Sequence, residues 1–199
     1  LGEVICGAAK GKNSAVLLTL GTGVGGGVIM DKRIFSGFLK GGCELGHMVI
    51  ERDGKQCTCG RKGCLEMYAS ASALMNDARA LAADAPQSLL LELSHGKIEA
   101  IDGKIIFEAA KRGDQAANKA VGAYLKNLSI GIANIINIFR PEIIILGGGV
   151  SAQKEYLTDL LQKLVNGMCF GGSHGEIPEI VTSALGNDAG IIGAAYLVE

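Results

Sequence analysis

One short segment of the sequence, residues 42–66, gathers most of the side chains that could do chemistry. It contains a histidine and three cysteines in the pattern H-x9-C-x-C-x4-C, which are His47, Cys57, Cys59 and Cys64. Imidazole nitrogen and thiolate sulfur are the usual ligands of structural zinc, and four of them complete its tetrahedron. Because four protein ligands leave no position for a reactive water, the sequence predicts a structural Zn2+ ion rather than a catalytic one.

Two glycine-rich turns each follow a short apolar run. Consecutive backbone N–H groups in such a turn form a concavity that suits a phosphate group. Without further context, a tight turn that binds nothing explains each of them equally well. The residues concerned are Gly21, Thr22 and Gly23 in the run GTGVGGG, and Gly147, Gly148 and Gly149 after the run EIIIL.

The composition favours a small-molecule partner. The chain has 199 residues, 30 of them glycine, and its 19 basic and 20 acidic residues give a net charge of −1. These charges are interspersed, so no patch for nucleic acid or for an anionic membrane is expected. The longest apolar runs are too short to span a bilayer. Cysteines outside the cluster are scattered, which indicates a reducing compartment, and the cytoplasm is the expected location.

Hydrophobic periodicity predicts three antiparallel strands followed by alternating helices and buried strands. The strands are expected at 14–20, 28–30 and 33–35, with the glycines of 21–27 in the first turn. A single helix is expected over 65–85, and Asp114 is expected to cap a long helix over 115–137. The remaining elements are helices at 104–111, at 153–165 and from residue 187, strands at 142–146 and 179–182, and an irregular stretch at 167–175. The predicted order is β-β-β-α-β-α-β-α, with residues 42–112 as an insertion.

This order is that of the ribonuclease H-like α/β unit of the actin, hexokinase and Hsp70 superfamily. The segments ELGH at 44–47 and CTCGRKGCLE at 57–66 resemble the E-x-G-H and C-x-C-G-x-x-G-C-x-E motifs of the ROK family of bacterial sugar kinases and repressors. The resemblance continues through GTGVGGG and GGGV to the terminal GNDAGIIGAA. Among the members of that family, the sequence is most similar to glucokinases.

The resemblance implies a role for each of these groups. It implies that the histidine and the three cysteines hold Zn2+, and that Glu44, His47 and Glu66 hydrogen-bond the hydroxyls of a hexose, with glucose favoured. It assigns the turn at 21–23 to the phosphates of ATP and Gly147 to Gly149 to its adenosine side, with Mg2+ as the second metal. The implied reaction is phosphorylation of the 6-hydroxyl. A sugar-sensing domain of a ROK repressor is the alternative.

The resemblance also implies that residues 1–199 form the larger, C-terminal lobe of a two-lobe protein. The opening LGEVICGAAKGK reads as the end of a helix between the lobes, over residues 1–12, and the chain is expected to be a fragment. Neither the phosphate motif D-x-G-G-T nor the catalytic aspartate of the family occurs in it. That aspartate is expected upstream of Leu1, so the isolated chain should be inactive. Asp188 reads as a helix cap, His95 and His174 as ordinary loop residues, and a homodimer is expected.

Overall fold

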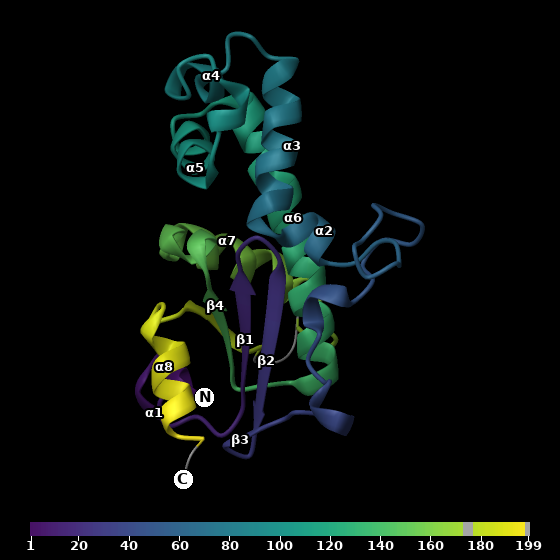
Figure 1. The fold of residues 1–199 in the computed structure, drawn as a ribbon, viewed down its shortest axis with the longest axis vertical. Coiled ribbons are helices and arrows are strands. Elements are labelled where there is room, and N and C mark those ends of the chain that lie inside the picture. The colour runs from purple at the N-terminus through teal and green to yellow at the C-terminus, as the bar shows by residue number, and fades with distance from the viewer. Residues whose placement is uncertain (173–176, 198–199) are drawn as a thin grey trace.

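A five-stranded mixed sheet forms the centre of the protein (Figure 1). The computed structural model describes residues 1–172 and 177–197. The strand order is β3-β2-β1-β4-β5, in which β1, β2 and β3 are antiparallel and β4 and β5 run parallel to β1. This confirms the predicted order of elements. The strands are β1 (Ala15–Leu20), β2 (Val24–Met30), β3 (Arg33–Ile34), β4 (Ile143–Gly147) and β5 (Glu179–Thr182).

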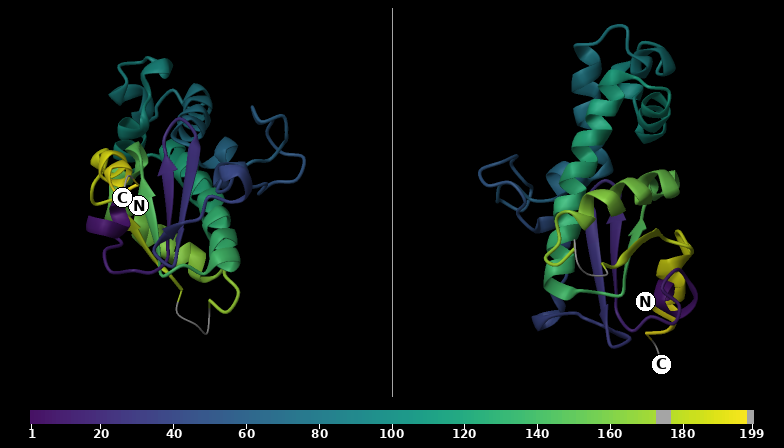
Figure 2. Two further views of the ribbon diagram at one scale, coloured as in Figure 1. Left: turned by 60° about the horizontal axis from the view of Figure 1, so that its bottom comes forward. Right: turned by 180° about the vertical axis from the view of Figure 1, so that it is seen from behind.

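Helices cover the two faces of the sheet unequally. Val16 and Leu18 of β1 and Ile144 of β4 belong to the main core, which the long helix α6 and helix α7 complete (Figure 2). On the opposite face a smaller cluster around Ile143 and Ile145 packs against the N-terminal segment. The helices are α1 (Gly2–Cys6), α2 (Glu66–Ala69), α3 (Ala71–Ala83), α4 (Leu89–Leu93), α5 (Gly103–Lys111), α6 (Gln115–Phe139), α7 (Glu155–Asn166) and α8 (Asp188–Ala195), with short 3-10 turns at Phe38–Lys40, Leu45–His47, Ile98–Ala100 and Gly149–Gln153.

Helix α6 links the sheet to a helical extension formed by α3, α4 and α5 (Figure 1). The side chain of Asp114 accepts a hydrogen bond from the N–H of Ala117 and caps the helix as predicted. At the other end Arg140 adopts a left-handed conformation, and Pro141 follows, which cannot continue a helix. None of the helices in the described part of the chain has the length and apolar character required to cross a bilayer.

The glycines of residues 24–27 lie in strand β2, and the prediction that they belong to the turn is wrong. Only residues 21–23 connect the two strands, and Gly25 pairs with Thr19 while Gly26 pairs with Leu18. At Gly26 a side chain would not fit. A Cβ atom at Gly26 would lie 2.6 Å from the carbonyl oxygen of Cys43, because the segment before the cysteine cluster crosses close over the strand.

The single helix predicted over residues 65–85 is interrupted, so that prediction also needs correction. Helix α2 ends at Ala69, and Ser70 has extended backbone angles before α3 begins at Ala71. Ser70 is 3% exposed, and its side chain accepts a hydrogen bond from the N–H of Ala73 at 3.0 Å, so it caps α3. A serine at this position satisfies one of the free N–H groups at a helix start.

Other elements differ from prediction by small shifts. Helix α1 spans only Gly2–Cys6 within the predicted 1–12. Asp188 is the first residue of α8, where the side chain of neither Asn187 nor Asp188 makes a capping hydrogen bond, so the reading of Asp188 as a cap is wrong. Of the predicted irregular stretch at 167–175, residues 173–175, including His174, lie outside the described residues.

Glu3 joins helix α1 to the segment that follows β5. Glu3 is 3% exposed, and its carboxylate accepts hydrogen bonds from the Ser183 hydroxyl and from the N–H groups of Ala8, Ala184 and Leu185. Burial acts to raise the pKa of Glu3, but these hydrogen bonds outweigh it and the pKa lies below the ordinary value of 4.5. Glu3 therefore contributes stability as a carboxylate.

This arrangement predicts a stability difference that disappears in acid. A carboxyl with a lowered folded-state pKa stabilises the protein above its unfolded pKa, and the stabilisation is lost as the pH falls through the folded value. We expect Glu3→Gln to lower the free energy of unfolding near neutral pH, and the difference from wild type to shrink below pH 4.5. Urea unfolding between about pH 3 and pH 7 measures it. Glu99→Gln, at an exposed position, is the control; a gap between Glu3→Gln and wild type that stays constant with pH would contradict the prediction.

Candidate functional site

The four predicted metal ligands come together in the structure. Their ligand atoms all lie within 4.8 Å of one another. His47 approaches Cys57 through Nδ1, at 3.6 Å from the sulfur, and the sulfurs of Cys59 and Cys64 are also 3.6 Å apart. Sulfurs bound at about 2.3 Å to one tetrahedral zinc ion would be about 3.8 Å apart. The residues therefore fit a four-coordinate metal site, with Nε2 of His47 left for another partner.

Backbone interactions, rather than regular secondary structure, shape the loop that carries the cysteines. Val49 and Cys64 form an isolated antiparallel bridge, as do Gln56 and Lys62. Gly63 has a φ of +79°, and a Cβ atom there would collide with the carbonyl oxygen of Glu51. The sequence C-G-R-K-G-C thus provides glycine where the loop closes on itself.

The sulfurs differ in their environments. Cys57 and Cys64 are buried, whereas Cys59 is exposed. Hydrogen bonding from the backbone of Arg61 is the main cause that lowers the pKa of Cys59, to about 6. Burial raises the pKa of the Cys64 thiol to about 12. Only thiolates bind a metal well, so binding at Cys64 would release a proton.

The turn at residues 21–23 offers free backbone donors. The N–H of Gly21 donates to the carbonyl of Gly23 at 3.0 Å and closes the turn. Within the described residues, the N–H groups of Thr22 and Gly23 donate to no protein group. Two adjacent unpaired donors next to an exposed threonine hydroxyl are what an anionic oxygen requires. The turn can therefore accept a phosphate group.

The carboxylate of Glu66 lies directly against this turn. Its Oε2 atom accepts a hydrogen bond from the N–H of Val24 at 3.0 Å. A pocket of about 490 Å3 is lined by Glu66 and by Thr22 and Gly23 of the turn, together with polar side chains from the cysteine loop and from α3. Glu44 and His47 do not line this pocket. Glu44 and His47 lie on either side of Gly46, which packs against the carbonyl of Val24. The segment that carries them and the side chain of Glu66 therefore both contact Val24 of β2.

The second glycine turn lies beside the end of β1. Gly147 pairs with Thr19, and Gly148 has a φ of +84° and packs so closely that a Cβ atom would lie 2.5 Å from the carbonyl oxygen of Leu20. Because Leu20 precedes Gly21, the two predicted turns are neighbours in space. Gly147 and Gly148 also line a pocket of about 590 Å3 between the sheet, α1 and α8, which is large enough for a nucleoside.

Two contributing residues escaped the sequence analysis. Lys55 ties the cysteine loop to the helices, because its N–H donates to the Tyr68 hydroxyl and its amine forms an ion pair with Asp77 at 2.8 Å. Ser70 is the second. A serine directly before an apolar helical run is an ordinary N-cap signal, but it was hidden because helical spacing continues across it.

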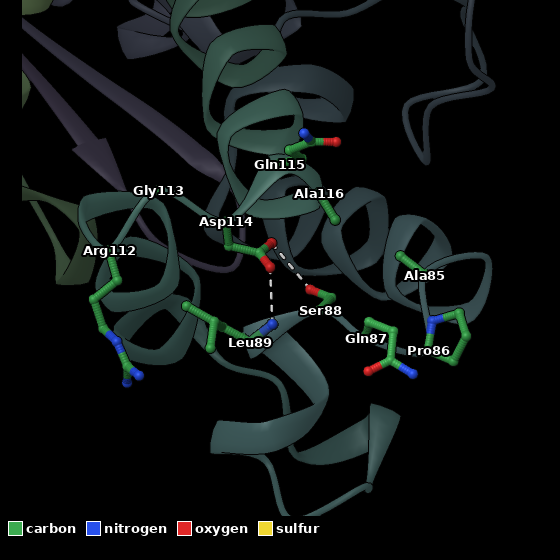
Figure 3. Close-up of a pocket in the computed structure, with 10 residues that line it drawn as sticks. All are labelled: Ala85, Pro86, Gln87, Ser88, Leu89, Arg112, Gly113, Asp114, Gln115 and Ala116. Atoms are coloured by element: carbon green, nitrogen blue, oxygen red, sulfur yellow. Dashed lines mark hydrogen bonds between the residues drawn. The ribbon is translucent and has the colours of Figure 1, made fainter.

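A further pocket of about 590 Å3 lies at the tip of the helical extension, where none of the predicted site residues reaches it. Figure 3 shows the Asp114 carboxylate in this pocket, bonded to the Ser88 hydroxyl at 3.0 Å and to the N–H of Leu89 at 2.8 Å. Asp114 also caps α6, so its oxygens already accept hydrogen bonds from N–H groups at the starts of α4 and α6. We interpret it as a structural residue.

This interpretation predicts a loss of stability when Asp114 is removed. Asp114→Ala deletes the cap of α6 and the acceptor for the Ser88–Leu89 segment, and we expect it to lower the free energy of unfolding by about 1–3 kcal/mol. Urea unfolding provides the measurement. Asp159→Ala, at an exposed position of α7, is the control. Equal free energies of unfolding for the two variants would show that Asp114 does not stabilise the tip of the helical extension.

Comparison with known proteins places the chain in a family. The ROK family model matches residues 1–199. A glucokinase of Thermotoga maritima is 41% identical, over 100% of this chain and 62% of its own length. A xylose repressor of Caldicellulosiruptor bescii is 30% identical, over 100% of this chain and 49% of its own. The crystal structure of a ROK family glucokinase from Streptomyces griseus with glucose and AMPPNP superposes with a TM-score of 0.91 at 36% identity, covering 98% of this chain and 64% of that one.

The chain therefore belongs to the ROK family. The fold is that of ROK glucokinase structures, as the resemblance of the motifs predicted. The chain spans about 62% of the length of the glucokinases it matches.

Proposed function

We propose that this chain is the hexose- and nucleotide-binding part of an ATP-dependent sugar kinase, with glucose as the favoured substrate. One observation carries the proposal: the free N–H groups of Thr22 and Gly23 and the carboxylate of Glu66 share a single pocket. A phosphoryl group and a sugar hydroxyl would meet there. The similarity to glucokinases supports the same conclusion.

In this proposal Glu44, His47 and Glu66 bind the sugar. Glu44 is exposed, and Oε1 of Glu66 has no partner among the described residues, so both can accept hydrogen bonds from hydroxyls. His47 would bind Zn2+ through Nδ1 and present Nε2 to the sugar. Zinc is structural here, and the loop that it stabilises carries His47 and leads directly into Glu66.

The remaining groups of the proposal concern the nucleotide. The turn at residues 21–23 would bind phosphate oxygens through backbone N–H groups. Gly147, Gly148 and Gly149 would form the adenosine side, where Gly147 and Gly148 line the pocket and Gly149 does not. Mg2+ would neutralise charge on the transferring phosphoryl group. By the resemblance to the family, we expect an aspartate outside these 199 residues to accept the sugar's proton. The residues of this chain therefore bind and orient the substrates in the proposed reaction.

Activity assays on the whole protein test the proposal. We expect ATP-dependent phosphorylation in a coupled assay with a panel of hexoses, with the largest kcat/KM for glucose. A sugar-sensing repressor is the second candidate, because a xylose repressor matches the full chain. A repressor would bind sugar in calorimetry and show no turnover, and it would bind operator DNA. Absence of turnover with every hexose, together with DNA binding, would replace the kinase proposal with this one.

A further inference from the structure

The connection between α2 and α3 holds the proposed phosphate turn at both ends. The N–H of Ala71 donates to the carbonyl of Gly21 at 2.8 Å. On the other side, Oε2 of Glu66 accepts from the N–H of Val24 at 3.0 Å. Residues 21–23 lie between these two bonds, so residues 66–71 bracket the turn.

The break at Ser70 makes the first of these bonds available. In a continuous helix the N–H of Ala71 would donate to a carbonyl of the preceding turn. As the first residue of α3, Ala71 instead has one of the unpaired N–H groups of a helix start. The buried Ser70 side chain fixes this start by capping it. The interruption of the helix therefore directs a backbone donor to the turn.

Packing makes the second bond a tight contact. A Cβ atom at Gly23 would lie 3.0 Å from the carboxyl carbon of Glu66 and closer still to its Oε2 atom. The turn therefore rests directly on the carboxylate. Oε2 is used by Val24, and Oε1 remains free among the described residues. A hydroxyl bound at Oε1 would restrict the same carboxylate that holds the turn.

We propose that residues 66–71 are a positioning element that couples the hexose site to the phosphate turn, so that each substrate strengthens binding of the other. The inference rests on the proposed function, since it assigns the sugar to Glu66 and phosphate to the turn. Coupling of this kind is reciprocal: sugar that fixes Glu66 orders the turn for the nucleotide, and the nucleotide orders Glu66 for the sugar.

Substitution of Ala71 by proline tests the first bond. Proline is well tolerated at the first position of a helix, and the extended backbone of Ser70 suits a residue before proline. Ala71→Pro thus removes the N–H donor to Gly21 and puts the ring Cδ in place of its hydrogen, so it also pushes the Gly21 carbonyl away, while α3 can still start at this residue. Gln115→Pro is the matched control, because Gln115 is the first residue of α6, follows the extended Asp114, and its N–H has no acceptor in the described part of the chain.

The measurements use the whole protein, with ADP and glucose as probes. In wild type, glucose should lower the Kd of ADP. Ala71→Pro should raise the Kd of ADP by at least about 3- to 10-fold, the effect of one lost hydrogen bond, and should weaken the effect of glucose on it. The Kd of glucose without nucleotide should stay unchanged. Gln115→Pro should behave as wild type. An unchanged ADP affinity and unchanged coupling in a folded Ala71→Pro variant would overturn the proposal.

Hydrogen exchange in the wild-type protein tests the coupling without a variant. Glucose alone should slow hydrogen exchange at the amides of Val24 and Ala71. Unchanged exchange rates at both amides would overturn the proposal. The outcomes separate this inference from the kinase assignment. Phosphorylation of glucose without coupling overturns only the positioning role, whereas coupled binding of glucose and ADP without phosphorylation supports that role and overturns the proposed function.

Discussion

Replacement of Cys64 by serine is expected to abolish zinc binding and to cause the largest loss of stability among the substitutions considered. The whole protein should contain about one zinc ion per chain, and the variant close to none, because three ligands and a poor hydroxyl donor cannot complete the tetrahedron. Cys64 is 0% exposed, and its backbone pairs with Val49 at the base of the loop. The binding of structural zinc contributes about 10–16 kcal/mol of folding free energy in zinc-finger peptides. Loss of even part of this free energy would destabilise the protein strongly.

Metal analysis and thermal unfolding with and without a chelator provide the measurement. The chelator should lower the Tm of wild type and leave that of Cys64→Ser unchanged. Cys6→Ser is the matched control, because Cys6 is exposed and its sulfur donates to the carbonyl of Gly2 within α1. A Cys64→Ser protein that keeps its zinc would disprove the assignment of the four ligands.

Glu66→Gln is expected to reduce kcat/KM for the sugar by about 10²- to 10³-fold, the second large effect. The amide oxygen of glutamine can still accept from the N–H of Val24, so the fold and the turn should remain. What is lost is the negative charge that strengthens hydrogen bonds from sugar hydroxyls. The substitution also puts an amide N–H2 group where a hydroxyl needs an acceptor.

Steady-state kinetics with glucose and ATP varied separately measures this effect. Glu51→Gln is the control, since Glu51 is an exposed residue of the loop that precedes Glu66. Its kcat/KM should equal that of wild type, and circular dichroism should show all three proteins folded. Activity of Glu66→Gln within about twofold of wild type would remove Glu66 from the proposed sugar site.

Among the parts of the candidate site, the metal cluster was the most predictable from the sequence. Its information is local: His47 and the three cysteines lie within one segment, and their side-chain chemistry identifies the kind of ligand. Asp114 and Pro141 likewise marked the ends of α6 closely, because caps and proline act on the residues next to them. Buried strands such as β4 were predicted from their apolar runs alone.

Sequence patterns assigned the wrong secondary structure to residues whose local preference differs from the conformation they adopt. Glycines 25–27 look like turn residues but lie in β2. At Gly26 the carbonyl oxygen of Cys43 lies too close for a side chain. Ser70 interrupts a helix whose periodicity continues, and Ala71 at the start of α3 donates to the carbonyl of Gly21. Both places involve contacts between segments distant in sequence.

The sequence by itself therefore determined the order of elements, the family motifs and the four candidate metal ligands, since each depends on residue type and short-range spacing. Only the tertiary structure decided that the two glycine turns are neighbours, that Glu66 lies against one of them, and that an N–H group at a helix break bonds to that turn. These relations depend on strand pairing and close backbone packing, which no local pattern specifies.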